Sequence, residues 1–97
     1  MYELQRTDVI DNWLLGLRDM RAKARILARL ESARLGNVGD TRSVGDRVSE
    51  MRVDVGVGYR VYFTRRQRVV LILLCGGNKS TQARDIARAK LMVQAID

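Results

Sequence analysis

The sequence predicts an α+β domain with an N-terminal helical hairpin, a twisted antiparallel sheet of three to four strands, and a C-terminal helix. Apolar residues recur at helical spacing before residue 36 and after residue 80. Between them, residues 41–75 alternate or run apolar between turn-forming residues, as strands do. The 97 residues, 46% apolar and 30% charged, fit one globular domain spanning 1–97.

The first 40 residues predict a short strand and two helices. Residues 2–6 are a strand candidate, and Thr7 is placed to cap a helix with Asp8 and Asp11 in its first turn. Gly16 and Asp19 mark the turn into a second helix that runs to about residue 35. This helix is expected to bury Ile26, Leu27, Leu30 and Ala33, and to expose a basic stripe of Arg18, Arg21, Arg25 and Arg29.

The rest of the chain predicts the sheet and the last helix. Strands are expected at about 41–45, 48–55, 58–65 and 68–75, and the run 69–75, apolar on both faces, should be a covered central strand. Gly76 and Gly77 are expected to form a turn, and Ser80 or Thr81 to cap a helix. That helix should dock Ile86, Ala89, Val93 and Ile96 on the sheet.

Strand alternation within 50–64 decides which polar side chains share a face. Glu50, Arg52 and Asp54 fall on one side of the first strand, and Arg60 and Tyr62 on one side of the next. Paired antiparallel, the two strands would gather Arg52, Arg60 and Tyr62 with one or both acids on an open face. Lys79 would arrive at the end of the following strand. A cationic patch with an aromatic ring and nearby carboxylates suits a phosphodiester chain.

The charge excess lies on the same segment. Residues 41–79 hold eight basic and three acidic side chains, which is +5 of the net +7. This distribution is typical of a nucleic-acid-binding surface. The alternative is a solvated basic sheet edge, where Arg65, Arg66 and Arg68 deter aggregation.

Several kinds of chemistry are excluded or disfavoured. The chain has no histidine, which excludes histidine-ligated zinc sites and histidine-based acid–base catalysis. Its single cysteine, Cys75, lies in an apolar run and is expected to pack as a small hydrophobic residue. No apolar run approaches the ~18 residues of a membrane span, and no signal-peptide pattern follows Met1. We therefore expect a cytoplasmic protein without metal, cofactor or membrane contact.

The same residues carry a family resemblance. The segment from Glu50 to Ile86 reads ExR…GxGYRVYF…LLxGGxKSxQxxDI, and WLLGLRD at 13–19 and RLxxxxxGNxGD at 29–40 extend the match over nearly the whole chain. This pattern resembles the RelE/ParE toxin superfamily, in particular the HigB-like addiction module killer proteins. Such sequences usually have glycine at the position of Arg47, proline at that of Val57, and commonly an acid at that of Asn78.

The resemblance implies a RelE-like fold and a toxin of a type II toxin–antitoxin system. Such toxins are generally mRNA interferases, ribosome-dependent endoribonucleases that inhibit translation. The implied partners are the ribosome, mRNA and a cognate antitoxin, expected to be a small helix–turn–helix protein. Two alternatives stay open: a ParE-like toxin that binds DNA gyrase and cleaves nothing, and a non-catalytic RNA-binding relic of a toxin.

Metal-independent RNA cleavage needs a base for the 2′-hydroxyl, positive charge for the transition state, and an acid for the leaving oxygen. The catalytic candidates are Arg60, Lys79, Arg52 and Glu50, and the RNA-binding candidates are Tyr62, Arg65, Arg66 and Arg42. The two arginines would stabilise charge, and Lys79 would act as acid or clamp. Glu50 or Asp54 is the conventional base, although Glu50 can instead only pair with an arginine. RelE-like nucleases use an arginine at the position of Arg60 and a basic group at that of Lys79.

Overall fold

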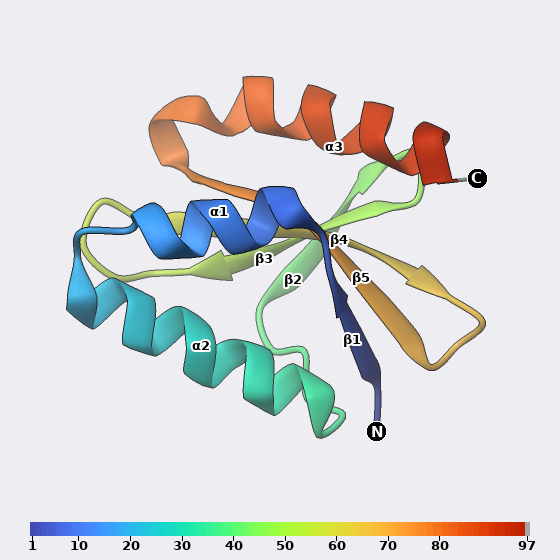
Figure 1. The fold of residues 1–97 in the computed structure, drawn as a ribbon, viewed down its shortest axis with the longest axis horizontal. Coiled ribbons are helices and arrows are strands. Elements are labelled where there is room, and N and C mark those ends of the chain that lie inside the picture. Colours follow the sequence, from blue (N-terminus) through green and yellow to red (C-terminus); the bar gives the residue numbers. More distant parts are fainter. Residues whose placement is uncertain (97) are drawn as a thin grey trace.

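The computed structural model describes residues 1–96 and places a five-stranded sheet between helices on both faces (Figure 1). The elements in chain order are β1 (Glu3–Arg6), α1 (Asp8–Gly16), α2 (Met20–Arg34), β2 (Thr41–Gly45), β3 (Val48–Val53), β4 (Tyr59–Arg66), β5 (Val70–Asn78), a 3₁₀ turn (Lys79–Thr81) and α3 (Gln82–Ile96). The α+β class, the N-terminal helical hairpin and the C-terminal helix are confirmed.

The sheet has the order β1-β5-β4-β3-β2. Strands β2 to β5 pair antiparallel, whereas β1 pairs parallel to β5, so the prediction of a purely antiparallel sheet of three to four strands is wrong. The reason lies in β5, which is apolar on both faces and needs partners along both edges. Its first edge is taken by β4, and the N-terminal strand β1 takes the other, from Glu3 opposite Val70 to Arg6 opposite Leu73.

Two hydrophobic clusters hold the helices to the sheet. One lies beneath α1 and α2 and contains Ile10, Leu14, Ile26, Val61 and Leu73, among others. The second lies beneath α3 and contains Val48, Tyr62, Ile72, Leu74, Ala89 and Val93, among others. Two docking predictions are wrong: Leu27 is 40% exposed because it lies about 100° around α2 from the buried Ile26, and Ile96, in the last turn of α3, is 38% exposed.

The helix starts follow local chemistry. Thr7 caps α1, since its hydroxyl accepts a hydrogen bond from the amide of Ile10 at 3.2 Å. Asp19 caps α2 through the amide of Ala22 at 3.0 Å. At the last helical segment the cap is Asn78, whose side chain accepts from the amide of Ser80 at 2.9 Å; this replaces the expected Ser80 or Thr81.

Gly76 and Gly77 lie inside β5 and do not form the expected turn. A Cβ on Gly76 would lie 2.4 Å from the Trp13 ring of α1, and a Cβ on Gly77 would lie 1.8 Å from a carboxylate oxygen of Asp85 on α3. The two glycines therefore let helices approach the end of β5 closely from both faces.

Both hairpin turns of the sheet have left-handed backbone at residues other than glycine. Asp46 and Arg47 join β2 to β3 with φ of 51° and 64°, and the three-residue turn 67–69 joins β4 to β5, with φ of 51° at Gln67 and 69° at Arg68. In the two-residue turn at 46–47, positive φ at both central positions is the type I′ geometry that favours glycine at the second position.

We expect Arg47→Gly to be more stable than Arg47→Ala by about 1 kcal/mol, because alanine keeps a Cβ in the left-handed region and glycine does not. Since both variants lose the arginine side chain, their difference isolates the backbone strain. Thermal or urea denaturation measures it. Equal stability of the two variants would mean that φ of 64° at residue 47 is not strained.

Candidate functional site

The predicted pairing of the two charged strands is confirmed. Glu50 lies opposite Tyr62 and Arg52 lies opposite Arg60 in the β3–β4 register. On the other side of β3, Arg42 of β2 lies opposite Glu50. The register thus brings Arg42, Glu50 and Arg60 into contact across three adjacent strands.

The face that carries these residues is not open, because α3 packs on it. Tyr62 is fully buried in the cluster beneath α3, and burial raises the pKa of its hydroxyl. Tyr62 was expected to bind RNA from an open face, and this prediction is wrong because a fully buried ring does not contact RNA. Alternation placed Tyr62 on the correct face, but it did not reveal that α3 would cover that face.

Glu50 is fully buried and held by groups from three other elements. One carboxylate oxygen, Oε2, accepts a hydrogen bond from the Gln82 amide at 2.9 Å. The other, Oε1, lies 3.5 Å from the Nε atoms of both Arg42 and Arg60, and neither contact is a hydrogen bond. A carboxylate enclosed in this way does not reach a 2′-hydroxyl at the surface. Glu50 is therefore not placed to act as the base. It pairs with Arg42 and Arg60, which was the alternative expectation.

Arg60 reaches from this buried carboxylate towards the surface. Only 5% of the residue is exposed, and its Nη1 donates to the carbonyl of Tyr59 at 3.0 Å. The same Nη1 lies 4.0 Å from a carboxylate oxygen of Asp54, whose side chain is exposed just beyond the end of β3. One guanidinium therefore connects the buried Glu50 with the exposed Asp54.

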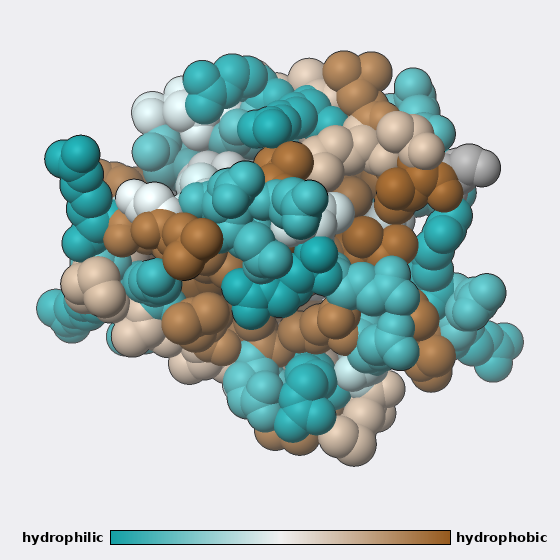
Figure 2. Space-filling model, in the orientation of Figure 1, coloured by the Kyte–Doolittle hydropathy of each residue, from teal (hydrophilic) through white to brown (hydrophobic). Residues whose placement is uncertain are grey.

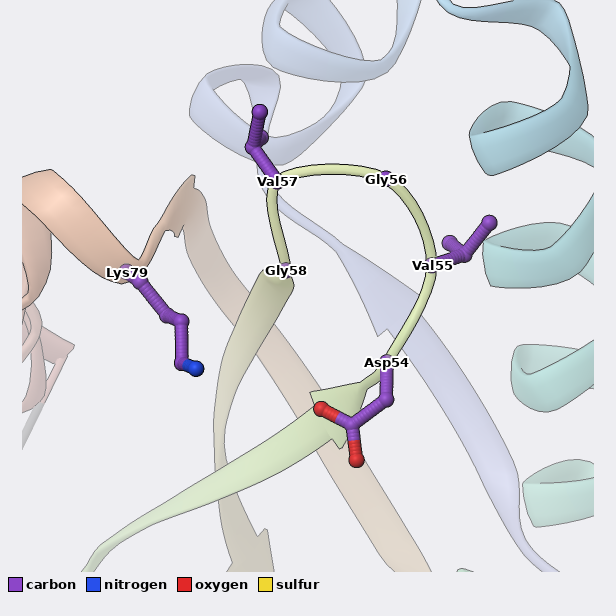
Figure 3. Close-up of a pocket in the computed structure, with 6 residues that line it drawn as sticks. All are labelled: Asp54, Val55, Gly56, Val57, Gly58 and Lys79. Atoms are coloured by element: carbon purple, nitrogen blue, oxygen red, sulfur yellow. The ribbon is translucent and has the colours of Figure 1, made fainter.

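Lys79 lies on the far side of the loop that joins β3 to β4. Its backbone amide donates to the carbonyl of Gly58 at 3.1 Å, and its side chain is exposed. Lys79, Asp54 and residues 55–58 line an open pocket of about 390 Å³. Figure 3 shows the side chains of Lys79 and Asp54 facing this shared space from opposite sides of the loop.

Arg52 contacts a carboxylate outside the pocket. Its guanidinium donates to Asp40 at 2.8 Å, and this hydrogen bond raises the pKa of Arg52. Arg29, expected on the solvated face of α2, donates to the carbonyl of Arg52 at 2.6 Å and to that of Val38 at 3.3 Å. Arg29 therefore anchors α2 to β3 and to the loop before β2.

The candidates Arg65 and Arg66 lie at the opposite end of β4 from Arg60. Arg65 lies over the Tyr2 ring at 5.0 Å and donates to its hydroxyl, and Arg66 donates to the carbonyl of Ile96 at 2.9 Å. At about 3.3 Å per residue, six residues of strand separate Arg66 from Arg60 by roughly 20 Å. Figure 1 shows the 54–58 loop and the β4–β5 hairpin at opposite ends of the sheet.

Other chemistry in the described chain is limited. Within residues 1–96, no three His, Cys, Asp or Glu side chains are grouped to hold a metal ion. Burial, reinforced by Asp85, raises the pKa of the Cys75 thiol to about 11, so it stays protonated at neutral pH. Across the same residues, no helix is both long and apolar enough to cross a membrane.

Sequence reasoning missed Gln82, the first residue of α3 and the hydrogen-bond donor to Glu50. The sequence does show a glutamine three positions after Lys79. It could not be linked to Glu50, because the sequence does not reveal which face of the sheet α3 covers. The candidate site is thus the exposed pair Lys79 and Asp54, with Arg60 between the pocket rim and the buried Glu50, and with Arg42 beside it.

Comparison with known proteins gives a relative but no described function. No family model matches the chain, and no solved structure matches it. An uncharacterized protein of Haemophilus influenzae is 48% identical over 94 residues, which cover 97% of this chain and 95% of that protein. The chain therefore belongs to the same protein family as this Haemophilus influenzae protein.

Proposed function

We propose that the protein is the toxin of a type II toxin–antitoxin system, with a RelE-like fold, and that it inhibits translation by cleaving mRNA on the ribosome. The observation that supports this best is the meeting of Arg60, Lys79 and Asp54 at one loop. A cationic fork, an exposed ammonium group and an exposed carboxylate are the groups that metal-independent cleavage of RNA requires.

The roles follow from exposure and contact. Arg60 stabilises charge on the pentacoordinate phosphorus, since its planar fork matches two phosphate oxygens. Asp54 is the carboxylate open to solvent and takes the proton of the 2′-hydroxyl. Lys79, across the pocket, protonates the leaving 5′-oxygen or holds the phosphate. Glu50, fixed by Gln82, orients Arg60 and does not touch the substrate.

The other parts of the proposal follow from the family resemblance and from the basic surface. The substrate complex would be mRNA on the ribosome, which places the action in the cytoplasm. Arg42, with its exposed side chain, is a contact for the RNA backbone. The controlling partner would be an antitoxin encoded beside the toxin gene. None of the proposed steps uses a cofactor or a metal ion.

Induced expression in a bacterial host tests this function. We expect rapid growth arrest, and we expect primer extension on a reporter message to show new 5′ ends only while the message is translated. Co-expression of the neighbouring gene should restore growth and yield a co-purifying complex. Growth arrest without message cleavage, accompanied by gyrase trapped on DNA, would contradict the nuclease and support the ParE-like alternative.

A second candidate is a non-catalytic RNA-binding protein. The burial of Glu50 and the 5% exposure of Arg60 favour it, because a guanidinium already paired with two carboxylates is less available to a phosphate. This candidate and the nuclease both bind RNA, but only the nuclease cleaves it.

Both candidates predict salt-dependent RNA binding. Each phosphate contact should lower the logarithm of the affinity by about 0.7 per unit logarithm of salt for single strands. Lys79→Ala and Arg42→Ala should each reduce this slope by about one contact. Arg34→Ala, which removes an arginine paired with Glu31 at 2.7 Å, is the matched control and should leave the slope unchanged. Filter binding over a salt series measures the slope, and a flat response would exclude both candidates.

A further inference from the structure

Asp85, in the first turn of α3, is a buried carboxylate to which the proposed mechanism gives no role. Only 4% of the residue is exposed, and its Oδ2 accepts a hydrogen bond from the Thr81 hydroxyl at 2.5 Å. The ion pair with Arg84 is weak, because the two atoms lie 3.7 Å apart and the arginine side chain is 79% exposed. Burying a carboxylate with so little compensating charge costs stability, and such a cost is typical of a residue with a functional role.

The contacts of Thr81 connect Asp85 with the turn that carries Lys79. The Thr81 hydroxyl has one proton, which it donates to Asp85, and its oxygen accepts from the Asn78 amide at 3.2 Å. These bonds close the 3₁₀ turn around Lys79, the first residue of that turn. The Lys79 amide donates to the carbonyl of Gly58 in the pocket-lining loop at 3.1 Å. A chain of hydrogen bonds therefore runs from the buried carboxylate to the backbone of the pocket.

The end of β5 leaves room for this chain of contacts. A Cβ on Gly77 would lie 1.8 Å from Oδ2 of Asp85 and 2.8 Å from the Thr81 hydroxyl oxygen, so a side chain there would displace both groups. Balancing the helix dipole does not require this burial, since an acid in the first turn does so from the surface. Figure 2, in the orientation of Figure 1, shows hydrophilic side chains over the first half of α3, where such an acid would lie in water.

We infer that Asp85 and Thr81 are positioning residues for Lys79. They hold the 3₁₀ turn so that the ammonium group faces the space it shares with Asp54, as Figure 3 shows. The inference rests on the proposed function of Lys79 as an acid or a phosphate clamp. Asp85 is buried and acts on the lysine only through Thr81 and the backbone of the turn.

The other cation of the site, Arg60, is held from the same turn of α3. Gln82 lies three residues before Asp85, so the two side chains share one face of the helix. Gln82 donates to Glu50 at 2.9 Å, and Glu50 lies 3.5 Å from the Nε of Arg60. One face of a single helical turn therefore positions both cations.

Thr81→Val tests the inference, because valine keeps the shape of the side chain and removes the hydroxyl. The rate of message cleavage should fall about tenfold, the usual weight of one to two hydrogen bonds, and Thr81→Ser should restore it. In protein that already carries Lys79→Ala, Thr81→Val should cause no further loss, since it acts through the lysine. Thr41→Val, the same change at a half-buried threonine of β2, is the matched control and should cleave as the wild type does. Primer extension measures all these rates.

A second measurement does not depend on cleavage. In folded Thr81→Val, hydrogen exchange at the Lys79 amide, followed by NMR, should be about tenfold faster, whereas exchange in β4 should not change. Asp85→Asn should give a smaller change in the same direction, because the asparagine oxygen can still accept from Thr81.

Unchanged exchange at Lys79 in both variants would overturn the inference. So would a failure of Thr81→Ser to restore cleavage, or a further loss when Thr81→Val is added to Lys79→Ala, because the threonine would then act on the fold and not through the lysine. Wild-type protein that never cleaves RNA, with exchange at Lys79 responding as expected, would overturn the proposed function and leave the positioning of Lys79 supported.

Discussion

Replacing Glu50 with alanine is expected to lower the free energy of unfolding by about 3–5 kcal/mol, the usual loss when one partner of a buried ion pair is removed. Arg60 would remain 5% exposed with its Nε opposite no anion, and only the exposed Asp54, 4.0 Å from Nη1, would offset its charge. Gln82 would lose its acceptor as well. For a domain of this size such a loss is a large part of the total stability.

Two comparisons make this result interpretable. Glu50→Gln keeps the shape and an acceptor for Gln82 but removes the charge, so it should fall between wild type and alanine. Asp40→Ala removes the acid of the exposed Arg52–Asp40 pair and should cost much less. Urea denaturation measures all three variants. Equal losses for Glu50→Ala and Asp40→Ala would mean that burial adds nothing to the Glu50 network.

Local chemistry in the sequence was enough to predict most of the fold. The caps at Thr7 and Asp19 and the antiparallel pairing of the two strands that carry Glu50 and Tyr62 depend on residues close in sequence or on strict two-residue alternation. Two failures were local, the cap at Asn78 and the helix face assigned to Leu27, whereas the direction of β1 depended on a long-range contact. The direction of β1 is set by the free edge of β5, more than 60 residues away, and no local pattern in residues 2–6 encodes it.

The sequence predicted which residues make up the candidate site, but it did not predict which of them are buried. Alternation assigns side chains to one of two faces, and it says nothing about which helix covers each face. Because α3 packs over Tyr62 and Glu50, two residues expected at the surface are in the core. Lys79 and Asp54 are at the surface because they flank the loop that joins β3 to β4, beyond the residues that α3 covers.

The basic residues of the sheet form two groups in the structure. Arg42, Arg60 and Lys79 lie around one end of β4, whereas Arg65 and Arg66 lie at its other end, and each of these two contacts the chain itself. Net charge counted along the sequence cannot resolve such groups, since the two ends of one strand are adjacent in the count. RNA that contacts both groups must extend roughly 20 Å across the sheet.

Arg60→Lys is expected to reduce message cleavage by about 10²–10³-fold, the usual loss when one electrostatic contact to the transition state is removed. Lysine keeps a positive charge near Glu50, so the protein should stay folded. Its single ammonium group cannot lie beside Glu50 and also present a planar fork to phosphate oxygens near Asp54. Arg60→Ala is the less informative variant, because it also leaves a buried carboxylate with only Arg42 and Gln82.

Primer extension on a translated reporter measures the cleavage, with circular dichroism as the folding control. Lys79→Ala should reduce cleavage without a loss of stability, since its side chain is exposed. Arg34→Ala, at the opposite end of α2 from Asp19, which approaches Gly56 of the pocket rim, should cleave as the wild type does. If folded Arg60→Lys cleaves normally, Arg60 acts only as the partner of Glu50, and Lys79 becomes the principal cation of the site. If wild-type protein binds ribosomes but never cleaves, the arginine is structural and the RNA-binding alternative replaces the nuclease.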